Sequence, residues 1–272
     1  MAPVDCTEQG YSQELSFGSG LAAVAMNLVV YPLLVIWTLL DILCFPVVFL
    51  LAKVLLRWET GRIVRGLIWV YGRGWLLIMA PFVSFRRAGF EKLREQPPSI
   101  FVVNHLSFFD TYCMGLLPIY DIVFAVRAWP FRMIWYGWVM RLARYLDVES
   151  HTFAENLGSA RRIIAAGGHI LFFPEGHRSR DGRLQRFYGG AFRLAAELGL
   201  PVVPLVLTGT GELLPPGRFW LRPTTITLRA LPAVDSTRFG GAENFRKLRR
   251  TVREAMAEAL VEGPLPAAGR EG

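Results

Sequence analysis

Residues 21–56 form an apolar stretch that limits the possible folds of this chain more than any other feature. From Leu21 to Leu40 every residue is apolar or uncharged, and a second apolar run extends from Ile42 to Leu56. The first run matches the ~20 residues that a helix needs to cross hydrocarbon. Because Asp41 separates the runs, we expect either one membrane span followed by an interfacial helix or a helical hairpin that dips into one leaflet. A buried core helix of a soluble protein is the alternative.

The charges that flank this stretch predict its orientation. Residues 1–20 contain no Lys or Arg, so they lack the basic region of a cleavable secretory signal. Lys53, Arg57, Arg62 and Arg65 all lie on the C-terminal side. Because positive charge is enriched in cytoplasmic loops, we expect the rest of the chain on the cytoplasmic face of a membrane, in a bacterium the inner membrane.

A helical stripe follows, formed by Arg62, Arg65, Trp69 and Arg73 on an otherwise apolar segment. This spacing predicts a helix in the plane of the lipid headgroups, with its arginines toward anionic lipid. A surface helix with a solvated basic face remains the alternative.

Composition favours membrane association and anionic partners. The mean hydropathy of the 272 residues is +0.34 and the net charge is +8. Such a charge suits phosphorylated substrates, acidic lipids or nucleic acid; the apolar stretch argues against nucleic acid. The three cysteines are far apart, which predicts neither a disulfide framework nor a zinc site. Neither His151 nor His169 has metal-ligand spacing with Asp, Glu or Cys, so we expect no metal.

From about residue 82 the pattern changes to short apolar runs that alternate with helical patterns. This alternation predicts an α/β fold with a mixed, partly parallel sheet flanked by helices on both faces, preceded by the N-terminal membrane-embedded helical segment. The predicted strands lie near residues 82–87, 99–103, 121–127, 169–173, 201–207 and 224–231, and the predicted helices near 107–116, 131–143, 153–166, 190–199 and 242–261. The expected organisation is an N-terminal tail (1–20), membrane-embedded and interfacial helices (21–80), a catalytic domain (81–262) and a disordered tail (263–272).

The stretch NHLSFFD, residues 104–110, carries a candidate acid/base pair. His105 and Asp110 could not meet on a regular helix, because residues five apart point about 140° away from each other. Ser107 and Asp110 form an S-x-x-D capping pattern, which predicts a helix from Phe108 and leaves Asn104 and His105 in the preceding loop. That turn brings Asp110 within reach of the imidazole, where a carboxylate can orient a general base. The capping and catalytic interpretations are compatible.

A second stretch, FFPEGHRSRDGRLQRF (172–187), directly follows an apolar run. Gly176 and Gly182 permit close backbone approach, and four arginines fall within nine residues: Arg178, Arg180, Arg183 and Arg186. Such a segment can cradle a phosphate, although a solvated basic loop has the same composition. Further on, PVVPLVL from Pro201 predicts a core strand in which Pro204 marks a sheet edge or a bulge.

Three blocks together resemble a known family. N-H-x-S-x-x-D (Asn104 to Asp110), F-P-E-G-x-R-S (Phe173 to Ser179) and V-V-P (Val202 to Pro204), in this order, resemble the glycerolipid acyltransferases of the lysophosphatidate (1-acyl-sn-glycerol-3-phosphate) acyltransferase type, over roughly residues 83–235.

The resemblance implies direct acyl transfer from acyl-CoA or acyl carrier protein as co-substrate, with no cofactor. His105 would deprotonate the hydroxyl of lysophosphatidate or a related lysolipid, Asp110 would orient His105, and phosphatidate would be formed for phospholipid synthesis. No acyl-enzyme is needed, so Ser107 is expected to cap a helix and, with Asn104, to shape the site. The expected partners are therefore membrane lipids, the lysolipid and the acyl donor.

The same resemblance assigns residues to the substrates. Glu175, Gly176, Arg178 and Ser179 match the acceptor-binding block, in which Arg178 would hold the phosphate and Glu175 would order the loop. Pro204 matches the block linked to the acyl donor. Arg127 lies where the family often has a basic residue.

Two departures keep other acceptors open. An intermediate family block usually ends in an arginine that helps to hold the acceptor phosphate, whereas this chain has Glu149, Ser150 and His151 there. His177 replaces the threonine common in F-P-E-G-T-R. A lysophospholipid, a lyso-ornithine lipid or glycerol 3-phosphate is therefore the alternative acceptor. A lipid hydrolase is a weaker alternative, because the chain lacks a G-x-S-x-G elbow.

Overall fold

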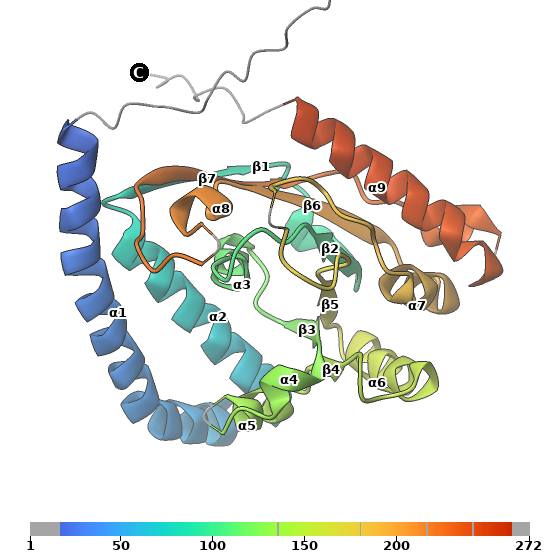
Figure 1. The fold of residues 1–272 in the computed structure, drawn as a ribbon. Coiled ribbons are helices and arrows are strands. Elements are labelled where there is room, and N and C mark those ends of the chain that lie inside the picture. The colour runs from blue at the N-terminus through green and yellow to red at the C-terminus, as the bar shows by residue number, and fades with distance from the viewer. Residues whose placement is uncertain (1–16, 135, 180, 216, 241, 263–272) are drawn as a thin grey trace, which may run out of the picture.

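A seven-stranded mixed sheet forms the centre of the protein, with the strand order β1-β7-β6-β2-β5-β3-β4 (Figure 1). The structure, a computed structural model, describes residues 17–134, 136–179, 181–215, 217–240 and 242–262. All neighbouring strands pair in parallel except β6 and β7, which are antiparallel. The strands are β1 (Val83–Ala88), β2 (Ile100–Val103), β3 (Ile122–Val126), β4 (Leu146–Asp147), β5 (His169–Phe172), β6 (Val202–Thr208) and β7 (Thr224–Ala230).

Helices cover both faces of this sheet, which confirms the predicted α/β class. The helices are α1 (Phe17–Leu51), α2 (Thr60–Met79), α3 (Asp110–Cys113), α4 (Ala128–Phe131), α5 (Gly137–Leu142), α6 (Phe153–Ala165), α7 (Gly190–Leu198), α8 (Thr210–Leu213) and α9 (Phe245–Val261). Alternate residues of β2 enter different cores: Phe101 and Val103 pack on the side of α1 and α2, and Ile100 and Val102 on the side of α7 and α9. This burial on both faces explains why the central strands are continuous apolar runs.

Helix α1 passes through Asp41 without a break. It begins at Phe17, before the predicted start at Leu21, and continues into a π-helical turn over Ala52–Leu56. Of the two arrangements considered for residues 21–56, the helical hairpin is therefore wrong, although α1 curves along its length, as Figure 1 shows. Its apolar part, Gly20–Leu56, is long enough to cross a membrane and is mostly exposed. The predicted tails lie largely outside the described residues, in 1–16 and 263–272.

The arginine stripe of α2 faces the α/β domain more than lipid, which corrects the prediction. Arg65 is 5% exposed, and its Nε donates to Asp121 Oδ1 at 2.6 Å. Arg62 donates to the Tyr120 hydroxyl at 2.8 Å. Only Arg73, which stacks over Trp69 at 4.7 Å, stays exposed. The spacing predicted the helix correctly. It could not predict that Arg65 pairs with the carboxylate of Asp121, which lies far away in the sequence.

Two predicted helices are much shorter in the structure. Residues 107–116 contain one short turn of α-helix, α3, followed by a 3₁₀ turn over Met114–Leu116. The segment predicted as one helix over 131–143 contains the end of α4 and then α5. Strand β4 was not predicted, because its two residues are too few to show the alternating pattern of a strand.

The parallel arrangement brings the ends of several strands to one edge of the sheet. β2, β5, β3 and β6 all point the same way, so the segments that follow them meet at their carboxyl ends. This edge is where open α/β sheets bind ligands. It collects residues 104–110, 173–179, 181–187, 209–215 and 217–223.

Candidate active site

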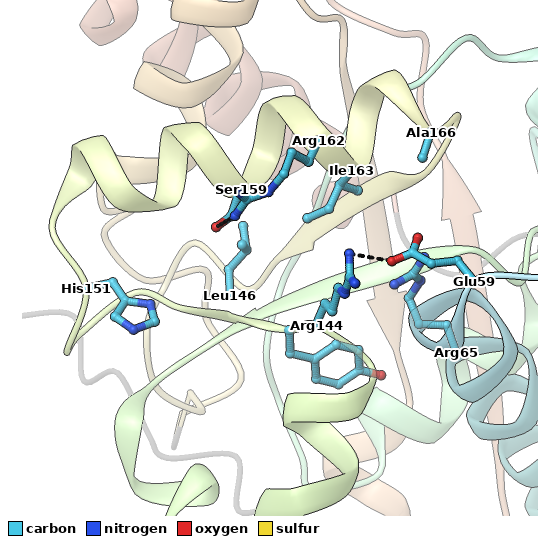
Figure 2. A pocket seen from close by; sticks show the side chains of 10 residues that line it. Glu59, Arg65, Arg144, Leu146, His151, Ser159, Arg162, Ile163 and Ala166 are labelled. Carbon is cyan, nitrogen blue, oxygen red and sulfur yellow. Dashed lines mark hydrogen bonds and ion pairs between the residues drawn. The ribbon is translucent and has the colours of Figure 1, made fainter.

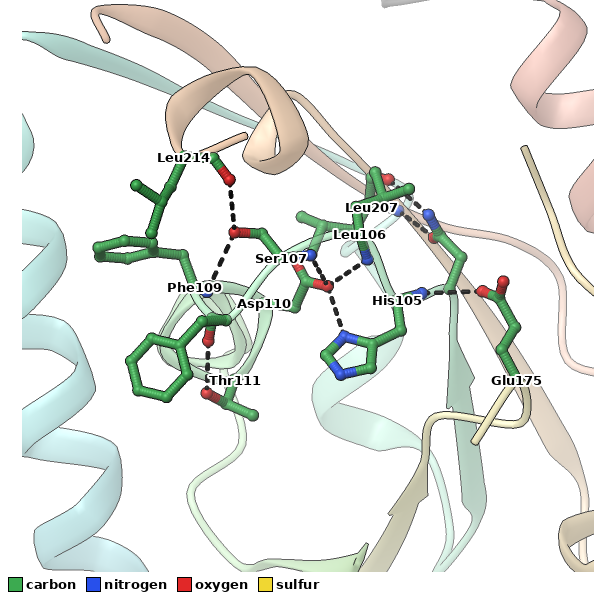
Figure 3. Close-up of polar contacts among 11 residues, drawn as sticks. His105, Leu106, Ser107, Phe109, Asp110, Thr111, Glu175, Leu207 and Leu214 are labelled. Atoms are coloured by element: carbon green, nitrogen blue, oxygen red, sulfur yellow. Dashed lines mark hydrogen bonds and ion pairs between the residues drawn. The ribbon is translucent and has the colours of Figure 1, made fainter. Parts of the chain in front are cut away.

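His105 and Asp110 form a hydrogen-bonded pair at this edge (Figure 3). His105 Nδ1 lies 2.7 Å from Asp110 Oδ2, with the carboxylate fully buried and the imidazole 19% exposed. Because an ionised carboxylate only accepts hydrogen bonds, Nδ1 carries the proton in the neutral imidazole and Nε2 has the lone pair. Nε2 has no hydrogen-bond partner among the described residues. The ring of Phe173 packs against the imidazole, with centroids 4.3 Å apart. The pair therefore has the arrangement of an oriented general base.

Asp110 also builds the turn that brings it to His105. Its Oδ2 accepts hydrogen bonds from the backbone N–H groups of Leu106 at 2.5 Å and Ser107 at 2.9 Å (Figure 3). The predicted cap by the Ser107 hydroxyl is wrong: α3 begins at Asp110, and its cap has no side-chain hydrogen bond. Of the two hydrogen bonds of a capping box, only the one from the Ser107 N–H to the Asp110 carboxylate is present. The turn therefore depends on the same carboxylate that orients the imidazole.

The second motif holds the backbone of His105 in place. Glu175 is 1% exposed, and its two carboxylate oxygens accept hydrogen bonds from the N–H groups of His105 and Gln185, each at 2.9 Å. Ser179 N–H donates to the His105 carbonyl at 2.7 Å. Burial raises the pKa of Glu175, and the two backbone hydrogen bonds oppose that rise. Gln185 was not singled out in the sequence, because its contribution is a backbone N–H.

A groove of about 1040 Å³ begins at Leu106 and Ser107, the two residues that directly follow His105. Arg178 lines this groove as well, whereas His105 and Asp110 are not among its lining residues. Arg178 is exposed and makes no hydrogen bond or ion pair with another described residue. Gly176, with φ of 71°, lies before it; a Cβ at this glycine would be 2.8 Å from the Tyr188 ring. Arg180 lies outside the described residues. The segment of residues 173–179, here called the FPEG loop, thus presents one free guanidinium, that of Arg178, to the groove.

Asn104 and Pro204 shape the sheet next to the pair. The Asn104 amide donates to the Leu207 carbonyl at 2.8 Å and accepts from the Leu207 N–H at 2.7 Å, so it extends the pairing of β2 with β6. Pro204 is buried within β6, between β2 and β7, so its predicted position at a sheet edge is wrong. It lies beside a bulge, the other predicted alternative, because two residues lie between Val202 and Leu205 while three lie between their partners, Val234 and Ala230.

Arg127 reaches the same edge of the sheet but carries an ion pair there. Its Nη2 lies 2.7 Å from Glu149 Oε1, and Glu149 Oε2 accepts the N–H of Ala128 at 3.0 Å. This bonding lowers the pKa of Glu149 below its ordinary value. Arg127 does not line the groove. Glu149 therefore pairs with the basic residue that was expected to bind substrate.

A second cavity, of about 480 Å³, shares no lining residue with the groove (Figure 2). Arg144 forms an ion pair with Glu59 there, and Arg65 is already paired with Asp121. Of the three arginines that line this cavity, Arg65 and Arg144 are ion-paired and Arg162 donates to the Ser159 hydroxyl at 3.1 Å, whereas Arg178 in the groove has no such partner among the described residues. The groove is the better candidate for an anionic substrate.

Comparisons with known proteins agree with the three sequence blocks. A family model described as Acyltransferase matches residues 84–208. A 1-acyl-sn-glycerol-3-phosphate acyltransferase from Limnanthes douglasii is 32% identical over 211 residues, which cover 74% of this chain and 69% of that protein. One from Chlamydomonas reinhardtii is 34% identical over 189 residues, covering 66% of this chain and 54% of that protein. The chain thus spans about half the length of the algal relative.

The fold is similar to that of a solved structure, the 1-acyl-sn-glycerophosphate (LPA) acyltransferase PlsC from Thermotoga maritima. The TM-score is 0.70 at 23% sequence identity, and the match covers 90% of this chain and 99% of that chain. This likeness supports the fold, and the sequence relatives support the family. The chain therefore belongs to the acyltransferase family of the 1-acyl-sn-glycerol-3-phosphate acyltransferase type.

Proposed function

We propose that this protein transfers a fatty acyl group from an acyl thioester to the free hydroxyl of 1-acylglycerol 3-phosphate, which makes phosphatidate. The observation that carries the proposal is the 2.7 Å contact between His105 and the buried Asp110, next to a groove that holds a free arginine. The names of the sequence relatives support lysophosphatidate as the acceptor. Acyl-CoA and acyl carrier protein are both suitable donors.

The chemistry starts at His105 Nε2. This nitrogen takes the proton of the acceptor hydroxyl while the oxygen attacks the thioester carbonyl, so a C–O bond forms and the C–S bond breaks. The proton then passes from the imidazolium to the leaving thiolate. Asp110 stabilises the imidazolium through the hydrogen bond at Nδ1. A proton shuttle of this kind contributes about 10²–10⁴-fold to the rate.

No covalent acyl-enzyme is required. Ser107 is 2% exposed, and its hydroxyl lies 3.5 Å from the Leu214 carbonyl. No described contact links this hydroxyl to His105, so it lacks the adjacent base that a serine nucleophile needs. Ser107 shapes the groove, while His105 acts directly on the acceptor.

The motif residues divide their roles between binding and positioning. Arg178 holds the acceptor phosphate. Glu175 and Ser179 fix the backbone of His105, and Gly176 allows the loop to pass close to Tyr188. Pro204 is buried, so it acts on the donor site only through the position of β6.

The membrane is the source of the acceptor, and α1 lies within one leaflet. Asn27 of α1 binds the backbone of Leu221, and Phe45 meets Trp138 of α5 at 5.7 Å. At 1.5 Å per residue these contacts extend over about 27 Å of helix, nearly the ~30 Å of bilayer hydrocarbon. A helix upright in the membrane would carry the α/β domain into the hydrocarbon. An in-plane helix keeps the domain in water, on the cytoplasmic face.

The ion pair of Arg127 with Glu149 favours a test of other acceptors. It removes one positive charge from the region where the family uses arginine, so a lysophospholipid, a lyso-ornithine lipid or glycerol 3-phosphate stays the second candidate acceptor. A transfer assay with labelled acyl-CoA would compare these acceptors with lysophosphatidate, using His105→Ala as the inactive control. Activity on lyso-ornithine lipid without activity on lysophosphatidate would overturn the acceptor assignment. Hydrolysis without transfer would overturn the reaction.

A further inference from the structure

The groove that begins at Leu106 and Ser107 has a second wall, formed by the β6–β7 loop (residues 214, 215 and 217–223). Leu214, Gly217 and Arg218 of this loop line the groove, together with Arg178 of the FPEG loop. The Arg218 side chain is exposed and makes no hydrogen bond or ion pair within the described part of the chain. Two free guanidinium groups from separate loops therefore reach one groove.

Helix α1 fixes this loop in position. Asn27 is 6% exposed on an otherwise apolar helix, and its amide both donates to the Leu221 carbonyl at 2.8 Å and accepts from the Leu221 N–H at 2.9 Å. The Tyr31 hydroxyl donates to the carbonyl of Phe219. The loop is also closed at its base, where Arg222 N–H donates to the Leu213 carbonyl at 2.9 Å. Arg218 thus lies on a segment with several fixed points.

The charge of the acceptor calls for more than one arginine. A phosphomonoester carries about −1.5 to −2 charges at pH 7, whereas Arg178 supplies one positive charge and Arg127 is neutralised by Glu149. One carboxylate, Asp181, also lines the groove, and its Oδ1 accepts hydrogen bonds from Ser179, Arg183 and Gln185. A second free guanidinium in the groove balances the remaining phosphate charge.

We propose that Arg218, held by the α1-bound β6–β7 loop, is a second ligand for the phosphate of the acceptor and favours acceptors with a terminal phosphomonoester. This inference rests on the proposed function and deepens it. The phosphates of acyl-CoA share the same chemistry, so the experiment must separate the two sources. The loop lies outside the three sequence blocks, where no motif marks Arg218.

The test combines kinetics with equilibrium binding in detergent micelles. Arg218→Ala should raise the KM for lysophosphatidate about tenfold or more, because a hydrogen bond to a charged group is lost, while the KM for acyl-CoA changes less than twofold. Arg218→Lys should recover part of the loss. Arg222→Ala is the matched control, because Arg222 is an exposed arginine of the same loop that does not line the groove.

Binding to inactive protein separates this inference from the proposed function. In a His105→Ala background, Arg218→Ala should weaken binding of lysophosphatidate about tenfold, measured by calorimetry, and leave binding of monoacylglycerol, which has no phosphate, unchanged. A higher KM for acyl-CoA, with normal lysophosphatidate binding, would assign Arg218 to the donor and overturn the proposal. The proposal would also be overturned if Arg218→Ala had the same KM values and the same lysophosphatidate binding as Arg222→Ala. If the wild-type protein did not acylate lysophosphatidate, the proposed function would fail. The binding comparison would still test whether Arg218 binds the phosphate.

Discussion

Replacing Asp110 by asparagine separates the charge of this side chain from its place in the turn. Oδ2 accepts hydrogen bonds from two backbone N–H groups and from His105, whereas the buried Oδ1 has no partner among the described residues. An asparagine can keep its oxygen at the Oδ2 position and put its amide where Oδ1 lies. The Asp110→Asn variant should therefore retain the turn and the orientation of the imidazole, but lose the negative charge next to it.

The expected loss follows from that one contact. A hydrogen bond to a charged group contributes about 1.5–3 kcal/mol, and 1.36 kcal/mol corresponds to a tenfold change in rate. If the imidazolium forms only during the reaction, the charge acts mainly in the transition state, so kcat should fall roughly tenfold to 150-fold while the KM for lysophosphatidate changes little. Asp110→Ala should lose more, because it leaves two backbone N–H groups of the turn without their acceptor.

The assay is continuous detection of released CoA thiol, with thermal unfolding of each variant in the same detergent. Asp235→Asn is a matched control, because Asp235 also accepts a backbone N–H, from Thr237 at 3.0 Å, in a 3₁₀ turn outside the groove. A kcat for Asp110→Asn within threefold of wild type, with unchanged unfolding, would refute the role of the charge.

Three further substitutions test the surrounding framework. Glu175→Gln tests a pH effect: burial raises the pKa of Glu175, so its contribution to stability is full below the ordinary glutamate pKa of about 4.3 and is lost as the pH rises through the raised value. Urea unfolding between pH 4 and 7 should show a smaller decline for the variant, and parallel curves would contradict this assignment. Ser107→Ala should keep kcat within about threefold in the thiol-release assay, since the hydroxyl makes only long contacts; a loss above a hundredfold would point to a serine nucleophile. Gly176→Ala should destabilise the protein by roughly 1–3 kcal/mol, because φ is 71° and a Cβ would meet the Tyr188 ring at 2.8 Å; unchanged thermal unfolding would show that the loop can relax.

Local patterns predicted the parts of the site that depend on neighbours in sequence. The five-residue spacing of His105 and Asp110 required a turn, and the structure has that turn. The pattern assigned the turn to the Ser107 hydroxyl, because S-x-x-D resembles a capping box. The buried carboxylate instead accepts both backbone N–H groups, which leaves Ser107 with only weak contacts.

Contacts between distant segments could not be predicted in this way. Glu175 and His105 are 70 residues apart, and their hydrogen bond exists because β2 and β5 are neighbours in the sheet. Arg65 has the helical spacing expected of a lipid-facing residue, yet it pairs with Asp121. The pattern within the helix holds no information about this distant partner. Pro204 predicted a sheet edge or a bulge, and the contacts of β6 with the segment opposite show a bulge in an interior strand, which the sequence could not distinguish from an edge.

The role of His105 as the base can be measured in a single turnover. Enzyme in excess would be mixed with labelled acyl-CoA and lysophosphatidate, and the rate of phosphatidate formation compared between wild type and His105→Ala, with the Kd of each protein for lysophosphatidate measured separately. A general base predicts a Kd within threefold and a transfer rate lower by about 10²–10⁴-fold. Transfer by His105→Ala at the wild-type rate, with the same Kd, would contradict the mechanism.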